Sequence, residues 1–396
     1  MIVERIEADY LIETASDPQS AIAAMAGEQS SGTFVSVPGE TEALKARSAA
    51  RVERVEVLGT VDAPSLPGAI DGDRRVQARA TLSWPLDNIG PSLPNLLATV
   101  AGNLFELKQF SGLKLLDIRL PSAFAAAYPG PKFGIAGTRK LAGVHDRPLI
   151  GTIVKPSVGF SAEQTAYLVK VRCAAGVDFI KDDELQSDGP ACPFDARAEA
   201  VMAVINNHAQ RTGNKVMYAF NLTGEMEQMR QRHDLVERLG GTCVVASLNS
   251  VGLVGMIELG RHSRLPIHAH RNGWGYLAGA DHMHVNGLAN KFSESDESAI
   301  ASAKACLTPM FQDKPCLVMP VFSSGQTVQQ AAGTYAALGS VDLIHTAGGG
   351  IMAHPGGPAG GVAALRQAWD AAQAGIEANQ YAADHPYLAH TLSGRS

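Results

Sequence analysis

The sequence has few cysteines, and none of them has the spacing of a disulfide framework or a zinc site. Its 396 residues include five cysteines, an odd number, with no Cys-x-x-Cys pair. They are Cys173, Cys192, Cys243, Cys306 and Cys316. Scattered cysteines of this kind are typical of a reducing compartment, and we expect a cytoplasmic protein.

The sequence also lacks an excess of positive charge and a membrane-spanning run. Lys and Arg number 33 against 39 Asp and Glu, which gives a formal charge of −6 at pH 7. Binding to nucleic acid requires a basic face, so we expect no nucleic-acid partner. One uncharged run, 346–365, contains seven glycines and two prolines, which excludes a membrane helix. The first residues lack the basic and apolar segments of a secretory signal.

Glycine, in contrast, is abundant. The chain has 40 glycines, about 10% of its residues, where about 7% is usual. An excess of glycine indicates tight turns or backbone that a ligand approaches closely. Hydrophobic residues at 45% and charged residues at 18% are typical of a globular chain.

Residues 1–125 predict an N-terminal α+β domain of the ferredoxin-like kind. Alternating polar and apolar residues indicate half-buried strands, and helical patterns separate them. The strands are expected at 1–14, 51–58, 75–84 and 114–120, an extended segment at 33–37, and helices at 17–27 and 94–105. Strands with one polar face predict an antiparallel sheet that is covered on one side.

Residues 126–396 predict a (β/α)₈ barrel. Short apolar strands alternate here with helical segments such as 162–174, 198–208 and 327–338. The eight expected strands are 149–155, 178–182, 216–222, 243–248, 265–270, 282–285, 316–321 and 343–346. Apolar strands with crossover helices indicate a parallel sheet, and eight such units in about 250 residues fit a barrel. A doubly wound open sheet is the alternative, because counting strands does not prove closure.

Polar side chains follow almost every expected strand. They are Lys155, Lys181, Asp182, Asp183, Glu184, Asn221, Asn249, His268, His270, Arg271, His282, His284, Asn286, Ser323 and Ser324. The carboxyl ends of barrel strands meet on one face, where the active sites of such enzymes lie. A non-catalytic scaffold would distribute polar groups over both ends, so the pattern favours an enzyme.

The segment 179–184, Phe-Ile-Lys-Asp-Asp-Glu, is a candidate metal site. Alternation places Lys181 and Asp183 on one face of the strand and Asp182 on the other. Asp183 and Glu184 offer the oxygen ligands that suit Mg²⁺. A solvated acidic loop is the alternative. Lys155, at the end of the first barrel strand, is a candidate proton shuttle, or else a lysine at the barrel rim.

Histidines and glycines mark the later strands. His268 and His270 share a face, Arg271 follows, and His284 comes from the next strand; a zinc site is conceivable, but proton transfer and anion binding fit better. The turns 323–325 (Ser-Ser-Gly) and 348–350 (Gly-Gly-Gly) follow the last two strands, where barrels often hold phosphate.

The chain resembles the large chain of the RuBisCO superfamily over nearly its whole length. The motifs that carry the resemblance are GTIVKPSVG (151–159), GVDFIKDDE (176–184), PIHAHR (266–271), HMHVNGLANK (282–291), PVFSSG (320–325) and TAGGGIMAHPGG (346–357). The resemblance implies an α+β domain followed by a (β/α)₈ barrel, and a homodimer whose active sites use both chains.

The resemblance also implies roles for individual residues. Lys181, carbamylated by CO₂, would bind Mg²⁺ together with Asp183 and Glu184. Lys155 would be the acid/base lysine, His270 a proton-transfer group and Lys291 the lysine of a closing loop. The substrate and its phosphate would contact Arg271, His284, Ser323, Gly325, Gly348 and Gly349, and from the partner subunit Glu28, Thr33 and Asn103, which lie in GEQSSGTF (27–34) and AGN (101–103).

Four departures separate the chain from true carboxylases. Ser157 replaces the second lysine of Lys-Pro-Lys, Phe34 replaces a tryptophan, Ser324 replaces the first glycine of Ser-Gly-Gly, and 292–294 are Phe-Ser-Glu instead of Leu-Glu-Gly. The metal-binding and enolising residues remain, whereas parts of the bisphosphate and CO₂ machinery do not. The resemblance is therefore to a RuBisCO-like protein.

The expected reaction is Mg²⁺-assisted enolisation of a phosphorylated keto-sugar or oxo-sugar acid, ending in isomerisation, decarboxylation or carbon–carbon cleavage. Alternatives are a 5-methylthioribulose-1-phosphate isomerase, a diketo-methylthiopentyl-phosphate enolase, a residual ribulose-1,5-bisphosphate carboxylase and a non-catalytic scaffold. The enolases of this superfamily lack the Lys-Pro that this chain keeps at Lys155-Pro156, which disfavours that alternative.

Overall fold

The computed structural model describes residues 4–31, 39–65, 69–70, 72, 74–270, 279–290 and 294–393. The chain divides into two compact units, Met1–Ala127 and Tyr128–Ser396. Each unit has its own sheet, and together they confirm the predicted fold class, an antiparallel α+β domain and a closed barrel.

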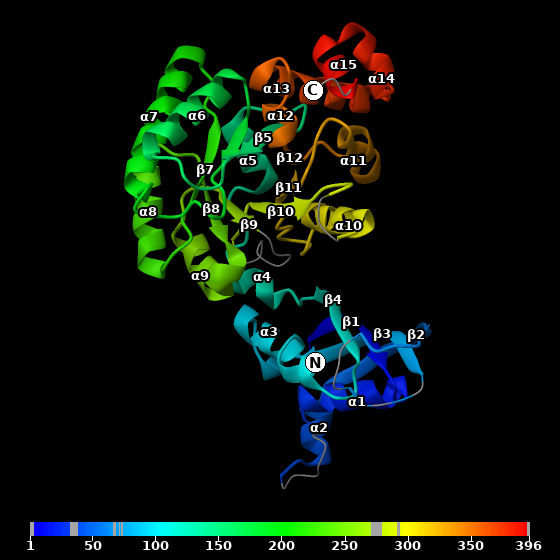
Figure 1. Cartoon of the computed structure of the whole chain (residues 1–396). Helices are drawn as coiled ribbons and strands as arrows, with labels where there is room; N and C mark the ends of the chain where they lie inside the picture. The colour runs from blue at the N-terminus through cyan, green and yellow to red at the C-terminus, as the bar shows by residue number, and fades with distance from the viewer. Residues whose placement is uncertain are drawn as a thin grey trace. The chain divides into compact units, whose positions relative to one another are not determined.

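The N-terminal unit is a four-stranded antiparallel sheet with the strand order β2-β3-β1-β4 (Figure 1). Its elements are β1 (Arg5–Thr14), α1 (Pro18–Glu28), α2 (Glu42–Ser48), β2 (Arg51–Val61), β3 (Arg75–Pro85), η1 (Leu86–Asn88), α3 (Leu93–Val100), η2 (Asn103–Glu106), β4 (Gly112–Arg119) and α4 (Ala123–Ala127). The main elements follow the β-α-β-β-α-β order of ferredoxin-like domains. The extended segment expected at 33–37 lies outside the described residues.

The helix expected at 94–105 is shorter in the structure, because it breaks at Gly102. A Cβ atom built on Gly102 would lie 2.3 Å from the carbonyl oxygen of Ala98, so only glycine permits this turn. The chain continues as the 3-10 helix η2. Helix α2, which the sequence pattern does not predict, begins after Thr41, whose hydroxyl accepts a hydrogen bond from the N–H of Leu44.

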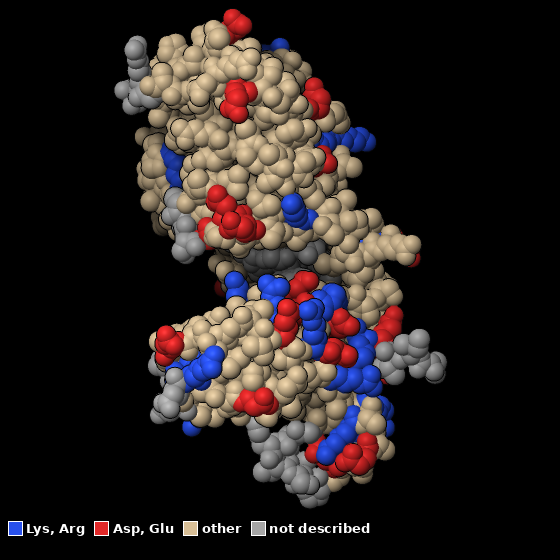
Figure 2. Space-filling view, turned by 90° about the vertical axis from the view of Figure 1, so that its right-hand side faces the viewer, with Lys and Arg blue, Asp and Glu red and all other residues tan. Residues whose placement is uncertain are grey.

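One face of the N-terminal sheet is buried and the other is exposed. Ile6, Ala8, Tyr10 and Ile12 alternate along β1 and are buried, and the Tyr10 hydroxyl donates to the carbonyl of Val100 over 2.7 Å. Acidic and basic side chains are interleaved on this unit (Figure 2). Such exposed charges contribute little to stability individually, but they keep the uncovered face polar.

The C-terminal unit contains a closed barrel of parallel strands (Figure 1). The strands are β5 (Leu149–Ile153), β6 (Phe179–Lys181), β7 (Met217–Asn221), β8 (Cys243–Ser247), β9 (Ile267–His270), β10 (His282–Asn286), β11 (Met319–Ser323) and β12 (Ile344–Thr346). Each lies within or overlaps one predicted strand. Pairing of β12 with β5 closes the ring and excludes the open-sheet alternative.

Helices surround the barrel. They are α5 (Gly134–Ala142), α6 (Ala162–Ala174), α7 (Phe194–Thr212), α8 (Met226–Arg238), α9 (Leu248–His262), α10 (Asp296–Leu307), α11 (Gln330–Leu338), α12 (Gly349–Met352), α13 (Gly357–Ala374), α14 (Ala378–Tyr381), η3 (Ala382–Asp384) and α15 (Pro386–Leu392). Helix α6 has the bounds that the sequence predicts, because Ser161 and Gln164 form a capping box at its start.

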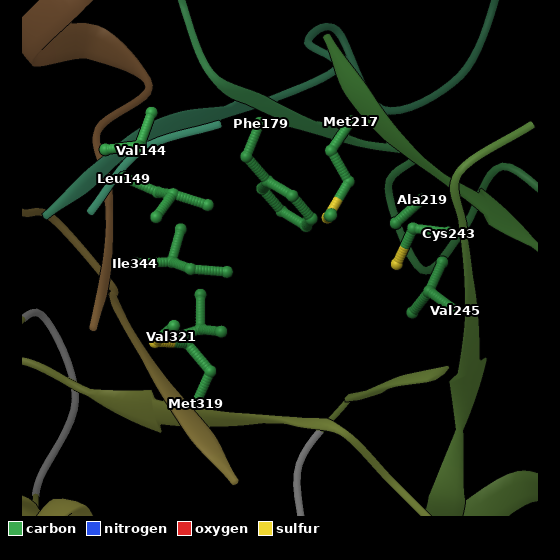
Figure 3. Packing of buried hydrophobic residues seen from close by; sticks show 10 residues of the cluster. All are labelled: Val144, Leu149, Phe179, Met217, Ala219, Cys243, Val245, Met319, Val321 and Ile344. Atoms are coloured by element: carbon green, nitrogen blue, oxygen red, sulfur yellow. The ribbon is translucent and has the colours of Figure 1, made fainter. Parts of the chain in front are cut away.

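Apart from His282, the interior of the barrel is mainly apolar toward the amino ends of the strands, and it is polar at their carboxyl ends. Its core comprises Val144, Leu149, Phe179, Met217, Ala219, Cys243, Val245, Met319, Val321 and Ile344, most of which point toward the middle of the barrel (Figure 3). Gly151 makes room for Phe179, since a Cβ there would lie 3.1 Å from that ring. Further along the same strands, inward positions hold Lys181, His270 and Ser323.

Two of the glycines in the run 346–365 have a different role from the expected one. An excess of glycine predicts turns or backbone close to a ligand, but Gly360 and Gly361 lie inside α13. A Cβ at Gly360 would lie 2.4 Å from Nδ1 of His354, and one at Gly361 would lie 2.3 Å from the carbonyl oxygen of Ile351. These glycines therefore allow close packing of α13 against the segment before it.

Within the described ranges, no helix combines the length and the apolar character that a bilayer-spanning segment needs. The five cysteines are all free thiols, four of them buried.

Candidate active site

The segment that ends β6 carries a buried lysine beside two carboxylates. The Lys181 amine is 1% exposed, and its Nζ donates to the carbonyl of Asp182 over 2.7 Å and lies 3.4 Å from Oε2 of Glu184. Burial lowers the pKa of Lys181, although Glu184 and Asp183 oppose this shift. Partial burial raises the pKa of Glu184, but the charges of Lys181 and His270 and the hydrogen bonds to its carboxylate together outweigh burial, so the pKa is lowered.

Lys155 reaches the same cluster from the neighbouring strand. It follows β5, which pairs with β6, and its Nζ lies 2.5 Å from Oδ2 of Asp183 and 2.7 Å from the hydroxyl of Ser157. Its side chain is 52% exposed, whereas that of Asp183 is 1% exposed. Lys155 therefore joins a buried carboxylate to the solvent-accessible side of the site.

Asp182 points the opposite way, as the strand alternation predicts. Its carboxylate accepts hydrogen bonds from the hydroxyl of Tyr218 and from the N–H of Asn221, and it lies 3.4 Å from Nη2 of Arg197. Burial is complete for Asp182 and Arg197. The Asn221 amide in turn donates to the carbonyls of Asp183, Glu184 and Gln186, over 3.2–3.3 Å. This network fixes the backbone that presents Asp183 and Glu184.

His270 and His284 lie beside the cluster. Nε2 of His270 is 3.4 Å from Oε2 of Glu184, and the His270 and His284 rings are 4.8 Å apart between centroids. His268 lies deeper, fully buried and stacked on Phe179 at 5.6 Å. Burial and the neighbouring imidazoles hold the pKa of His268 well below its usual value, so that ring is neutral.

The zinc alternative finds no support among these histidines. In the described part of the chain, the one group of at least three His, Cys, Asp and Glu side chains close enough to share an ion is His233, Asp234 and His262, outside this site. There the N–H of Arg264 donates to Nε2 of His233, so Nδ1 of that ring carries the proton and donates to Asp234 over 3.0 Å. The group is a hydrogen-bonded cluster.

The turns after β11 and β12 differ in backbone conformation and in the packing around them. Ser324, where the resemblance expects glycine, has a φ of 70°, a left-handed conformation that costs a serine roughly 1–2 kcal/mol. Its hydroxyl donates to Oδ1 of Asn286 over 2.5 Å, and the Ser323 hydroxyl donates to the carbonyl of Val285 over 3.0 Å. No described atom lies within 4 Å of a Cβ built at Gly348 or Gly349, so the protein's own packing does not require glycine there.

The structure thus brings together the strand-end residues Lys155, Lys181, Asp183, Glu184, His270 and His284 on paired strands. Ser323 ends β11, and Gly325, Gly348 and Gly349 follow β11 and β12 at the same end of the barrel. Glu28 ends α1 in the N-terminal unit. Thr33, Phe34, Arg271 and Lys291, and the side chain of Asn103, lie outside the described residues.

The donor set fits a magnesium ion. Asp183 and Glu184 supply hard carboxylate oxygens, and Lys181 lies within reach of Glu184. A carbamate on Lys181 would add a third oxygen ligand of the same chemistry. The buried carboxylate of Asp183 has Lys155 and the N–H of Leu185 as partners, which leaves lone pairs for a metal ion.

Tyr218 and Arg197 are residues of the network around Asp182 that the sequence does not indicate, whereas Asn221 is expected at a strand end but without a role. Asn221 stands at a strand end, which is a weak signal. Tyr218 sits inside an apolar strand and Arg197 inside α7, and nothing in their sequence context distinguishes them from core or surface residues.

These features define a class: a (β/α)₈-barrel protein, preceded by a ferredoxin-like domain, with lysines and carboxylates clustered at the carboxyl ends of its strands. Family models place it more narrowly. The model of the ribulose bisphosphate carboxylase large chain, catalytic domain, matches residues 134–277 and 274–394, and that of its N-terminal domain matches residues 8–124. The chain belongs to the RuBisCO large-chain family.

Two named proteins and one solved structure are similar to this chain over nearly its whole length. A 3-oxo-isoapionate-4-phosphate transcarboxylase/hydrolase from Xanthobacter autotrophicus is 56% identical, over 98% of this chain and 99% of that protein. A 3-oxo-isoapionate-4-phosphate decarboxylase from Rhizobium etli is 43% identical, over 97% of both chains. The crystal structure of a rubisco-like protein from Burkholderia fungorum has a TM-score of 0.92 and 46% identity, covering 98% of this chain and 99% of that one. The relatives from Xanthobacter and Rhizobium bear the names of enzymes, and the solved structure confirms the resemblance to RuBisCO-like proteins.

Proposed function

We propose that this protein is a Mg²⁺-dependent enolising enzyme that removes or transfers the carboxyl group of a phosphorylated 3-oxo sugar acid of the 3-oxo-isoapionate 4-phosphate type. The observation that carries the proposal is the contact of Lys155 with Asp183 beside the Lys181–Glu184 pair. This contact joins a partly exposed amine to a buried carboxylate that belongs to the candidate metal ligands. The names of the two relatives supply the substrate class.

The chemistry of a 3-oxo acid suits such a site. When the bond from C2 to the carboxyl carbon breaks, its electron pair remains as an enolate on the former ketone, and the carboxyl carbon leaves as CO₂ or passes to an acceptor. Mg²⁺, held by carbamylated Lys181 together with Asp183 and Glu184, would supply positive charge for the enolate oxygen. Lys155 gives a proton to the carbon, and its hydrogen bond to Asp183 holds the amine in position.

The remaining residues bind and orient the substrate. His270 contacts Glu184 and moves a proton at the substrate oxygens, with His284 beside it. Ser323, Gly325, Gly348 and Gly349 hold hydroxyl and phosphate groups, as do Arg271 and Lys291 once the substrate is bound. On the basis of the family resemblance, we also propose a homodimer. In it, Glu28, Thr33 and Asn103 of one protomer reach the partner's active site.

The reaction is tested with 3-oxo-isoapionate 4-phosphate carrying ¹³C in the carboxyl group, followed by NMR. Label that appears as CO₂ and bicarbonate identifies a decarboxylase, and label in a second organic product identifies transfer or hydrolysis. A phosphorylated keto-sugar such as 5-methylthioribulose 1-phosphate, supplied in parallel, tests isomerisation. If the labelled 3-oxo acid is not consumed, or if only the keto-sugar is converted, the proposal fails.

The metal dependence is tested with Asp183→Asn and, because Asp183 is buried, with the more exposed Glu184→Gln as a second variant. Loss of one metal ligand should lower kcat by about 10³-fold and abolish the response to added Mg²⁺. Asp313→Asn, at an exposed loop position, is the matched control and should behave as wild type. Full turnover in excess EDTA would contradict the proposal.

A further inference from the structure

A cavity of about 290 Å³ opens at the amino ends of β5, β6 and β7. Its charged lining residues are Arg147, Asp178, Lys215 and Arg366, and His208 also lines it. Asp178 stands immediately before β6, whereas Lys181 ends that strand, so the cavity lies at the opposite end of the barrel from the candidate active site. Nothing in the proposed reaction uses these residues.

The only carboxylate of the lining is already neutralised. Nη1 and Nη2 of Arg147 form a paired contact with the two oxygens of Asp178, at 2.6 and 2.9 Å. The N–H of Ile150 donates to the same carboxylate over 2.8 Å. Asp178 therefore has little capacity left to balance a second cation.

Arg366 carries a positive charge that Asp178, already paired with Arg147, does not neutralise. Its Nη2 donates to the carbonyl of Gly176 over 2.6 Å and lies 3.4 Å from Oδ1 of Asp178, a weak contact. Its Nε is buried, and its Nη1 forms no hydrogen bond with the described residues. Burial and repulsion by Arg147 lower the pKa of Arg366, as expected for a cation that lacks a full counter-charge.

The other groups around the cavity do not supply that counter-charge. Lys215 adds a further cation to the lining. Burial and the nearby Arg211 lower the pKa of His208, which is neutral at pH 7. Asp146 and Asp370 interact with these arginines at longer range, but both are exposed and outside the lining, where solvent and salt screen them.

We propose that this cavity is a second anion-binding site, which takes a phosphate group, either inorganic phosphate or the phosphate end of a small metabolite. Arginine presents a planar set of N–H donors that matches phosphate oxygens. Arg366 contributes its Nη1 as a donor, and Lys215 adds a further positive charge to the lining. A volume of about 290 Å³ accommodates a phosphate with a short organic substituent. The site is independent of the proposed reaction.

The test is isothermal titration calorimetry of the full-length protein with inorganic phosphate, at constant ionic strength set by NaCl. Arg366→Gln should weaken the affinity of this site at least tenfold, and Lys215→Gln two- to fivefold. Lys170→Gln removes one charge from the exposed side of α6, outside the lining, and should leave the affinity unchanged. Phosphate should also raise the Tm of the wild type and of Lys170→Gln more than that of Arg366→Gln.

Ser323→Ala separates the two ends of the barrel, because the carboxyl end can also bind phosphate. Binding that survives Ser323→Ala and is lost in Arg366→Gln supports the proposal. Binding that is lost in Ser323→Ala and unchanged in Arg366→Gln overturns it, as does the absence of saturable phosphate binding in the wild type. If Arg366→Gln fails to fold, the proposal depends on Lys215→Gln, and an unchanged affinity in that variant overturns it.

Discussion

The two ends of β5 and β6 carry similar groups in opposite arrangements. At the amino end, Arg147 and Asp178 form a closed pair in which both carboxylate oxygens have guanidinium donors. At the carboxyl end, Lys155 and Lys181 share two carboxylates through single contacts, and Glu184 is partly exposed. Both ends contain ion pairs. Only at the amino end does the carboxylate have a partner that contacts both of its oxygens.

The difference separates a stabilising ion pair from a reactive one. A carboxylate with a bidentate guanidinium and a backbone N–H has little left to offer a ligand, so its main effect is on folding. Amines and carboxylates held by single, strained or solvent-facing contacts can exchange protons or partners at little cost. Changes at the carboxyl end should therefore affect turnover, and changes at the amino end should affect stability.

The largest expected effect is on turnover, at the carboxyl end. Lys155→Arg keeps a cation beside Asp183 but replaces an amine that can give up a proton with a guanidinium that cannot. We expect kcat for the phosphorylated 3-oxo acid to fall by about 10²–10⁴-fold, with the Tm within a few degrees of wild type. Steady-state kinetics and a thermal melt measure the two quantities.

Lys140→Arg is the matched control, since Lys140 is exposed on α5. A Lys155→Arg variant that keeps wild-type kcat would remove Lys155 from proton transfer. One that loses its kcat because it unfolds would mean that the carboxyl end is also a stabilising cluster.

The next effect is on stability, at the amino end. Arg147→Met removes the bidentate partner of Asp178 and leaves only Arg366 and a backbone N–H beside a largely buried carboxylate. We expect the free energy of unfolding to fall by about 3 kcal/mol, the lower end of the range for breaking a buried pair. Denaturant melts measure it, and kcat of the folded variant should stay near wild type.

Arg211→Met provides the comparison for Arg147→Met, because it removes an exposed arginine from the end of α7. Its unfolding free energy should change by less than about 0.5 kcal/mol. Equal losses for the two variants would show that the Arg147–Asp178 pair adds nothing beyond general charge.

The buried His282, at the amino end of the barrel, predicts that the stability of the protein depends on pH. His282 opens β10 and is fully buried; its Nε2 lies 2.8 Å from the hydroxyl of Thr138, and burial lowers its pKa to about 3. An unfolded histidine titrates near pH 6.5, so below that pH the unfolded chain binds a proton that the folded chain excludes. The stability that neutral His282 provides is complete above pH 6.5 and is lost as the pH falls toward 3, at about 1.4 kcal/mol per pH unit.

Urea melts of wild type and His282→Gln between pH 7 and pH 5 measure this contribution. The stability advantage of the wild type over the variant should shrink by about 2 kcal/mol over that range. His145→Gln, at an exposed position, should show no comparable change. A constant difference for His282→Gln would mean that the folded protein admits a charged His282.

The sequence was sufficient for the barrel because its signals are local. Apolar strands at regular intervals, the capping box at Ser161 and the strand-end residues all lie within short segments. The alternation of Lys181, Asp182 and Asp183 was also sufficient to place Asp182 on the far side of the strand.

What the sequence could not indicate depends on contacts between distant segments. Arg147, Asp178 and Arg366 meet only because the barrel closes and α13 returns to β5 and β6. Gly360 and Gly361 belong to a run of glycines that could equally form a loop, and the close approach of His354 and Ile351 is what makes them helical packing positions. Tyr218 looks like an ordinary core residue until its hydroxyl is seen to meet Asp182.

The smallest expected effect tests whether the network behind the carboxyl end belongs to the stabilising kind or the reactive kind. Tyr218→Phe removes the hydroxyl that donates to Asp182 and leaves the ring packed against Phe220, with ring centroids 4.4 Å apart. Because Arg197 and the N–H of Asn221 still contact that carboxylate, we expect a loss of about 1–2 kcal/mol in the free energy of unfolding. If the network only stabilises the fold, Mg²⁺ affinity measured by calorimetry will be unchanged. If it also positions Asp183 and Glu184, Mg²⁺ will bind less tightly while KM for substrate stays the same. Tyr10→Phe, which removes a buried hydroxyl hydrogen bond in the N-terminal unit, is the control and will show only the loss of stability.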